Sequence, residues 1–166
     1  MFVLGIDPGL TRCGYGGVGR AGVVLTATAA GVVRTDPAAD VPSRLAELHD
    51  GITALLDELR PDVVAVERVF FNANVRTAMS VGQASGVVLA AAAGAGCAVA
   101  QYTPTEVKHA VTGSGAADKA QMTRMVQALL RLSQPPRPAD AADALALALC
   151  HHAVAPLQDR IAAAAP

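Results

Sequence analysis

Charged and aromatic residues are both scarce in this chain of 166 residues. Charged residues make up 16% of it and aromatic residues 3%, tryptophan is absent, and apolar residues reach 52%. A composition this apolar is typical of a folded domain and excludes a disordered tail or linker. The length suits one domain with one hydrophobic core and is too short for two domains of ordinary size.

Cysteine is also rare, and Cys13, Cys97 and Cys150 lie far apart in the sequence. Because their number is odd and no CxxC pair occurs, the sequence indicates neither a zinc site nor a disulfide framework. The N-terminus lacks a basic flank and carries Asp7, which argues against a signal peptide. We therefore expect a protein of the reducing cytoplasm.

The segment from Thr77 to Thr105 contains no charged residue. Its length alone would allow a membrane-spanning helix, which needs roughly 20 apolar residues. It is, however, rich in Ala, Gly and Ser, and alanine drives membrane insertion weakly. We predict a buried helix followed by a buried strand here, and no membrane association.

Short apolar runs and helical periodicity predict an α/β domain over residues 1–155 with a loose tail over 156–166. The expected strands are 2–6, 14–18, 23–33, 62–67 and 98–102. The expected helices are about 43–59, 74–93, 105–111, 118–132 and 140–154, with Ser43 as N-cap of the first and a capping box at Asp118 and Gln121 in the fourth. Three strands followed by alternating helices and strands indicate a mixed five-stranded sheet covered on both faces.

Four carboxylates occupy positions that suit a shared site. Asp7 and Glu67 each end an apolar strand, and ligands of such sheets bind outside the carboxyl ends of the strands. Asp140 and Asp143 open the last helix at i, i+3 spacing, so both can project from one face of its first turn. Taken singly, each acid has an ordinary explanation, because Asp7 could shape a turn, Glu67 could face solvent, and the helical pair could cap free N–H groups.

Together, four converging acids would repel one another and could not all stay ionised without cations. Hard divalent ions with oxygen ligands would resolve this repulsion, and two such ions about 4 Å apart are the apparatus for in-line attack on a phosphodiester. The net charge of −1 does not exclude a nucleic-acid substrate. With four of the 14 acids occupied by metal, 13 Lys+Arg face ten remaining acids, a working surface of about +3.

Motifs along almost the whole chain resemble the RuvC family of bacterial Holliday-junction resolvases. They are, in order, Gly5-Ile6-Asp7-Pro8-Gly9, Gly14-Tyr15-Gly16, Pro42-Ser43-Arg44-Leu45, Glu67-Arg68-Val69-Phe70-Phe71, Gly82-Gln83-Ala84-x-Gly86-Val87, Val107-Lys108, Lys119-x-Gln121 and Ala139-Asp140-Ala141-Ala142-Asp143-Ala144-Leu145-Ala146. The resemblance implies an RNase H-like fold, a homodimer in the bacterial cytoplasm, and paired symmetric nicks in four-way junction DNA. It also implies a branch-migration motor as a partner.

The same resemblance implies two Mg²⁺ ions per active site, with Mn²⁺ as an alternative. The ligands would be Asp7, Glu67, Asp140 and Asp143. We infer that Asp7 would bridge both ions, that Glu67 would complete one site, and that Asp140 with Asp143 would complete the other. One ion would activate the attacking water and the other would stabilise the departing 3′ oxygen.

Family resemblance also assigns four residues to DNA. Phe70 would stack on a base at the junction centre, where stacking contributes roughly 1–3 kcal/mol per base. Lys108 and Lys119, the only two lysines, and Arg76 would contact phosphates, which set position and salt dependence. Without the resemblance, Phe70 would be explained by core packing, and the cationic residues would be explained as ordinary solvent-exposed surface.

Other functions remain open from the residues alone. The Gly-x-Asp-x-Gly turn also resembles the phosphate-binding turn of sugar kinases and actin-like ATPases, which need a second domain for which this chain has no room. An RNase H-like nuclease acting on another nucleic acid and a non-cleaving junction-binding protein are further alternatives. His109, His151 and His152 receive no role, the latter two being expected at the end of the last helix, where cations suit the dipole. The small residues of helix 74–93 suggest a twofold dimer interface.

Overall fold

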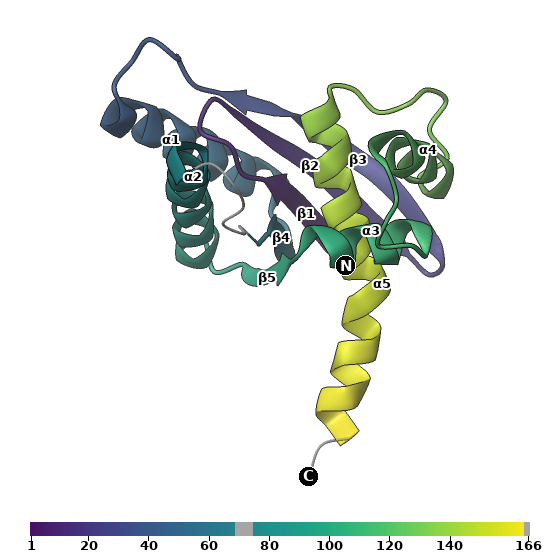
Figure 1. The fold of residues 1–166 in the computed structure, drawn as a ribbon. Coiled ribbons are helices and arrows are strands. Elements are labelled where there is room, and N and C mark those ends of the chain that lie inside the picture. The colour runs from purple at the N-terminus through teal and green to yellow at the C-terminus, as the bar shows by residue number, and fades with distance from the viewer. Residues whose placement is uncertain (69–74, 165–166) are drawn as a thin grey trace.

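The computed structural model describes the backbone of residues 1–68 and 75–164, and the side chains of 1–68 and 78–156 (Figure 1). The strands are β1 (Phe2–Asp7), β2 (Arg12–Ala21), β3 (Val24–Arg34), β4 (Val63–Glu67) and β5 (Ala98–Tyr102). The helices are α1 (Val41–Leu59), α2 (Val75–Gly94), α3 (Pro104–Thr112), α4 (Lys119–Leu129) and α5 (Ala139–Ala164). The predicted order of strands and helices is confirmed.

All five strands form one mixed sheet in the order β3-β2-β1-β4-β5. β1, β2 and β3 pair antiparallel as the predicted meander, while β4 and β5 extend the sheet parallel to β1. The parallel half requires crossover connections, and α1 and α2 provide them.

Helices cover both faces of the sheet, as Figure 1 shows. Because side chains alternate along a strand, neighbours in β1 point to opposite faces, with Leu4 and Ile6 facing α1 and α2, and Val3 facing α5. Each of the two resulting cores contains fully buried aliphatic side chains.

The first half of α5 lies directly on β1 and β2 because those strands carry glycine beneath it. A Cβ on Gly5 would overlap the backbone carbonyl of Ala144, and a Cβ on Gly14 would overlap that of Asp140. Glycine therefore allows the helix backbone to rest on the strand backbone, which fixes where the acidic first turn of α5 sits.

Helix ends agree with the sequence in some places and differ in others. The capping box of Asp118 and Gln121 is confirmed. The N-cap of α1 is Asp40 rather than Ser43. The backbone N–H of Ser43 donates a hydrogen bond to the Asp40 side chain. Thr103 and Glu106 form a second capping box at the start of α3, which begins one residue earlier than expected.

The last helix is longer than predicted. It continues through Pro156 to Ala164, so the expected tail from residue 156 is helical almost to its end and extends beyond the sheet (Figure 1). His151 and His152 consequently lie within the helix, not at its end. Both are buried, with His151 Nδ1 2.8 Å from the Tyr102 hydroxyl and His152 Nε2 2.9 Å from the Val18 carbonyl.

Across the described residues, no helix combines the length and hydropathy that crossing a membrane would require. The charge-free stretch that raised the question divides into most of α2, a turn at Gly96 and strand β5. The predicted helix and strand are both present, but the expected burial of the strand is wrong, because β5 lies at the edge of the sheet and only its Tyr102 is buried.

Candidate active site

Asp7 and Glu67 stand at the carboxyl ends of neighbouring parallel strands. β1 and β4 pair with Ile6 opposite Val66, so the two acids that follow are level with each other. On the other side of β1, Asp7 is paired with Gly14 of β2. The expectation that both acids reach the same edge of the sheet is confirmed.

The acidic first turn of α5 reaches this same edge from the face of the sheet. Asp140 lies over Gly14, the cross-strand partner of Asp7. Asp143, three residues further along the helix, points into a cleft between α5, α3 and α4. Strand ends and helix start therefore meet, although they lie more than 70 positions apart in the sequence.

This cleft has a volume of about 320 Å³ and contains three of the four acids. Its polar lining residues are Asp7, Glu67, Asp143, Lys108 and Lys119, and its apolar lining residues are Pro104, Val107, Met122, Ala146 and Leu147. Asp140 lies at the edge and does not line the cleft. The site thus joins an acidic floor to a rim that carries both lysines of the chain.

Crowding of the acids changes their ionisation. Burial, then repulsion from Glu67, Asp143 and Asp140, raises the pKa of Asp7 from its ordinary 3.8 to about 7, and only Lys119 opposes the rise. Burial and repulsion from Asp143 also raise the pKa of Glu67. A site in which two acids resist ionisation has a local excess of negative charge, which a cation would neutralise.

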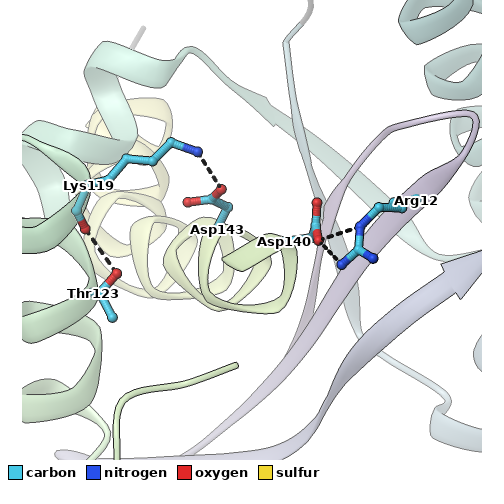
Figure 2. A network of polar contacts seen from close by, with 5 residues as sticks. All are labelled: Arg12, Lys119, Thr123, Asp140 and Asp143. Carbon is cyan, nitrogen blue, oxygen red and sulfur yellow. Dashed lines mark hydrogen bonds and ion pairs between the residues drawn. The ribbon is translucent and has the colours of Figure 1, made fainter. Parts of the chain in front are cut away.

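Two side-chain cations already face the acids of α5, as Figure 2 shows. Lys119 Nζ lies 3.5 Å from Asp143 Oδ2. Arg12 donates from Nε, at 3.0 Å, and from Nη2 to one oxygen, Oδ2 of Asp140. Hydrogen bonding to Arg12 is the largest cause that lowers the pKa of Asp140, so this acid ionises at a lower pH than Asp7 does.

The donor set suits a hard divalent cation. Every candidate ligand is a carboxylate oxygen, which is the donor that Mg²⁺ and Mn²⁺ prefer. Among the described residues, no three His, Cys, Asp or Glu side chains are arranged to hold a metal as they stand. Arg12 pairs with Asp140 and Lys119 with Asp143, so both cations partly neutralise the charge that a metal would neutralise.

Of the four residues predicted to contact DNA, two lie in the cleft and two have side chains outside the described residues. Lys108 and Lys119 line the cleft, from α3 and α4 respectively. Arg76 belongs to the first turn of α2, and its side chain lies outside the described residues, as does all of Phe70. Arg12 was not predicted, because an arginine near the start of a strand carries no sequence signal for a partner 128 positions away.

The sequence profile of one protein family, described as crossover junction endodeoxyribonuclease RuvC, matches residues 3–151. A protein of that description from Salinispora arenicola is 63% identical over 166 residues, covering 99% of this chain and 95% of its own length. One from Streptomyces coelicolor is 59% identical over 162 residues, covering 97% of this chain and 86% of its own.

Solved structures give the same result. Thermus thermophilus RuvC in complex with a Holliday junction substrate superposes with a TM-score of 0.89 at 40% identity, covering 95% of this chain and 96% of that one. The yeast mitochondrial Holliday junction resolvase has a TM-score of 0.65 at 15% identity, covering 89% and 77%, and supports the fold alone.

Proposed function

This chain belongs to the RuvC family of crossover junction endodeoxyribonucleases, and we propose that it cuts junction DNA at the cleft formed by Asp7, Glu67 and Asp143, with Asp140 at its edge. It is a Holliday-junction resolvase of RNase H-like α/β fold, which hydrolyses phosphodiester bonds of DNA. The observation that carries the site assignment is the meeting of carboxylates from β1, β4 and α5 in one cleft, where the pKa of Asp7 rises to about 7.

Two Mg²⁺ ions, or Mn²⁺ in their place, fit these four acids. When bound, the ions supply an acidified water for attack on phosphorus and a counter-charge for the departing 3′ oxygen. Asp7 lies between Glu67 on the next strand and the first turn of α5, so it would hold such ions together with the acids on either side. A bound cation would offset the repulsion between the carboxylates, which would lower the pKa of Asp7 and favour its ionised form.

Lys108 and Lys119 hold the scissile strand over the acids. Their helices begin at the two capping boxes, at Thr103 and Asp118, which fix the first turns of α3 and α4 beside the cleft. A lysine on this rim binds phosphate as a point charge and supplies affinity without reading sequence. Phe70 and Arg76, which follow Glu67 closely in the chain, are proposed to stack on a junction base and to bind phosphate.

A synthetic four-way junction and a linear duplex of matched sequence test this function. We expect paired, symmetric nicks in the junction with Mg²⁺, none in the duplex, and binding without cleavage when Ca²⁺ replaces Mg²⁺. Equal cutting of the duplex would favour an RNase H-like nuclease with another substrate. Tight junction binding with no cleavage under any divalent ion would favour a non-cleaving junction-binding protein.

Paired nicks require two active sites, and we propose that α2 forms the interface of a homodimer. The exposed residues of its described part recur at helical spacing along one stripe and are mostly small, comprising Met79, Gly82, Gln83, Gly86, Ala90, Ala93 and Gly94. Met79, 65% exposed, adds an apolar anchor that water contacts in the monomer. A stripe of small residues lets a second copy approach closely around a twofold axis, which matches the symmetry of a four-way junction.

Gly86→Glu is expected to convert the dimer to a monomer. A Cβ at Gly86 meets nothing within 4 Å in the protomer, and glutamate favours helix over glycine, so the protomer fold is preserved. Analytical ultracentrifugation at micromolar concentration measures the change. Ala46→Glu, at an exposed position of α1, is the matched control and is expected to stay dimeric. A wild-type protein that is monomeric under these conditions would contradict the interface.

Membership of the family also suggests the setting in which this enzyme works. We propose that it acts in recombination and repair of DNA in the bacterial cytoplasm, together with a branch-migration motor. The described structure contains no disulfide, with Cys13 and Cys150 buried as free thiols, which suits a reducing compartment.

A further inference from the structure

The tightest polar contact at the active site joins Asp140 to a residue outside the proposed catalytic set. Arg12 directs both Nε and Nη2 at the Oδ2 atom of Asp140, whereas the Lys119–Asp143 pair is longer, at 3.5 Å (Figure 2). The Lys119 side chain is 85% exposed, while Arg12 and Asp140 are 36% and 28% exposed. Of the two described cations that pair with acids of α5, Arg12 therefore makes the closer contact.

Backbone packing keeps the two partners together. Arg12 is fixed in β2 opposite Arg34, and the carbonyl of Asp140 rests on Gly14, two residues along the same strand. Helix and strand cannot separate without breaking this contact. A change in the pairing of Asp140 must therefore come from rotation of the two side chains, which is a small movement.

Asp140 is also the one acid of the four that does not line the cleft. At the edge of the cleft, the Asp140 carboxylate pairs with the guanidinium of Arg12, which belongs to β2. A divalent ion that used Asp140 as a ligand would compete with Arg12 for Oδ2. This step rests on the metal site proposed above.

We propose that Arg12 is an internal counter-cation that competes with the divalent ion for Asp140 and so sets the metal concentration at which the site fills. In the absence of metal the guanidinium neutralises Asp140 and limits repulsion with Asp7. Metal binding replaces the Arg12 contact, so the observed metal affinity is lower than it would be without Arg12. Arg12 is thus a positioning residue, acting through Asp140.

Arg12→Met tests the competition because it keeps much of the side-chain volume and removes the guanidinium. Arg44→Met is the matched control. Arg44 reaches the loop after β1 and donates to hydroxyls of Thr11 and Thr35, so its loss removes the same charge without freeing a carboxylate. Arg12→Gln, which is neutral and polar, provides a second variant with the same expected direction.

Isothermal calorimetry with Mn²⁺, without DNA, measures the affinity directly. A partly exposed ion pair is weak, so we expect Arg12→Met and Arg12→Gln to bind Mn²⁺ about three- to tenfold more tightly than wild type. Arg44→Met is expected to stay within about twofold. Mg²⁺ is also expected to raise the melting temperature of both Arg12 variants more than that of wild type, because their metal-free site lacks the counter-charge.

Unchanged Mn²⁺ affinity in both Arg12 variants would overturn the proposal. An equal gain in Mn²⁺ affinity in Arg44→Met would also overturn it, because the gain would then come from loss of any positive charge near the site. Asp140→Asn separates this result from the proposed function. If Asp140→Asn weakens Mn²⁺ binding while the Arg12 variants do not alter it, the metal site stands and the competition is wrong. If Asp140→Asn binds Mn²⁺ like wild type, the ligand assignment itself is wrong.

Discussion

Asp7→Asn is expected to abolish junction cleavage, by about 10³-fold or more, while junction binding is retained. Asp7 contributes a charged ligand at the centre of the acid group, and asparagine keeps its shape without its charge. Binding is expected within about threefold of wild type or tighter, because loss of one negative charge in the cleft favours the approach of a phosphate. A residue that only shaped the turn after β1 would lose binding and cleavage together.

The same substitution is expected to stabilise the metal-free protein at neutral pH. The folded pKa of Asp7, about 7, lies above its ordinary 3.8, so between these values the unfolded chain releases a proton that the folded chain keeps. Stability from this group therefore falls as pH rises through that window. A rise of about three pKa units corresponds to at most about 4 kcal/mol, and we expect about 2–3 kcal/mol at pH 8 after side-chain relaxation.

Urea unfolding of wild type and Asp7→Asn at pH 4 and pH 8, with and without Mg²⁺, measures this effect. We expect the gain at pH 8 without Mg²⁺, little difference at pH 4, and a smaller difference when Mg²⁺ binds the wild-type acids. Asp57→Asn, at an exposed position of α1, changes the net charge equally and serves as the control, with no expected gain in stability. A destabilised Asp7→Asn at pH 8 would show that the carboxylate is structural.

Much of this arrangement follows from local sequence patterns. Apolar runs that end in Asp7 and Glu67 predict strands whose acids share a sheet edge, because neighbouring parallel strands present their carboxyl ends together. The i, i+3 spacing of Asp140 and Asp143 predicts a common helix face. The shared sheet edge agrees with the structure. On α5, Asp143 lines the cleft and Asp140 lies at its edge.

What the sequence does not predict depends on contacts between distant segments. The pairing of Arg12 with Asp140 requires knowing that α5 crosses β2, and no local pattern encodes that crossing. The length of α5 was underestimated because Pro156 and the alanines after it have weak periodicity. Burial of His151 against Tyr102 depends on the packing of α5 against β5, which no local pattern encodes. Roles assigned to Phe70 and Arg76 stay predictions, since both side chains lie outside the described residues.

Gly14→Ala is expected to damage the active site without touching any acid. A methyl group at this position would overlap the carbonyl of Asp140 and lie 2.6 Å from its carbonyl carbon, both backbone atoms that cannot rotate away. The start of α5 must then rise from β2, carrying Asp140 and Asp143 away from Asp7. A displacement of about 1 Å at catalytic groups costs about 10²-fold in rate, and overpacking costs about 1–3 kcal/mol in stability.

Gly19→Ala on the same strand provides the matched control, because its Cβ would meet its nearest neighbour at 3.9 Å, an ordinary contact. We expect Gly19→Ala to keep wild-type cleavage and stability, while Gly14→Ala cleaves about 10²-fold more slowly and binds Mn²⁺ more weakly. Single-turnover cleavage at saturating Mg²⁺ and calorimetry with Mn²⁺ measure the two effects. Full cleavage by Gly14→Ala would mean that α5 can shift without moving its acids, and would contradict the view that the strand glycines set the geometry of the metal ligands.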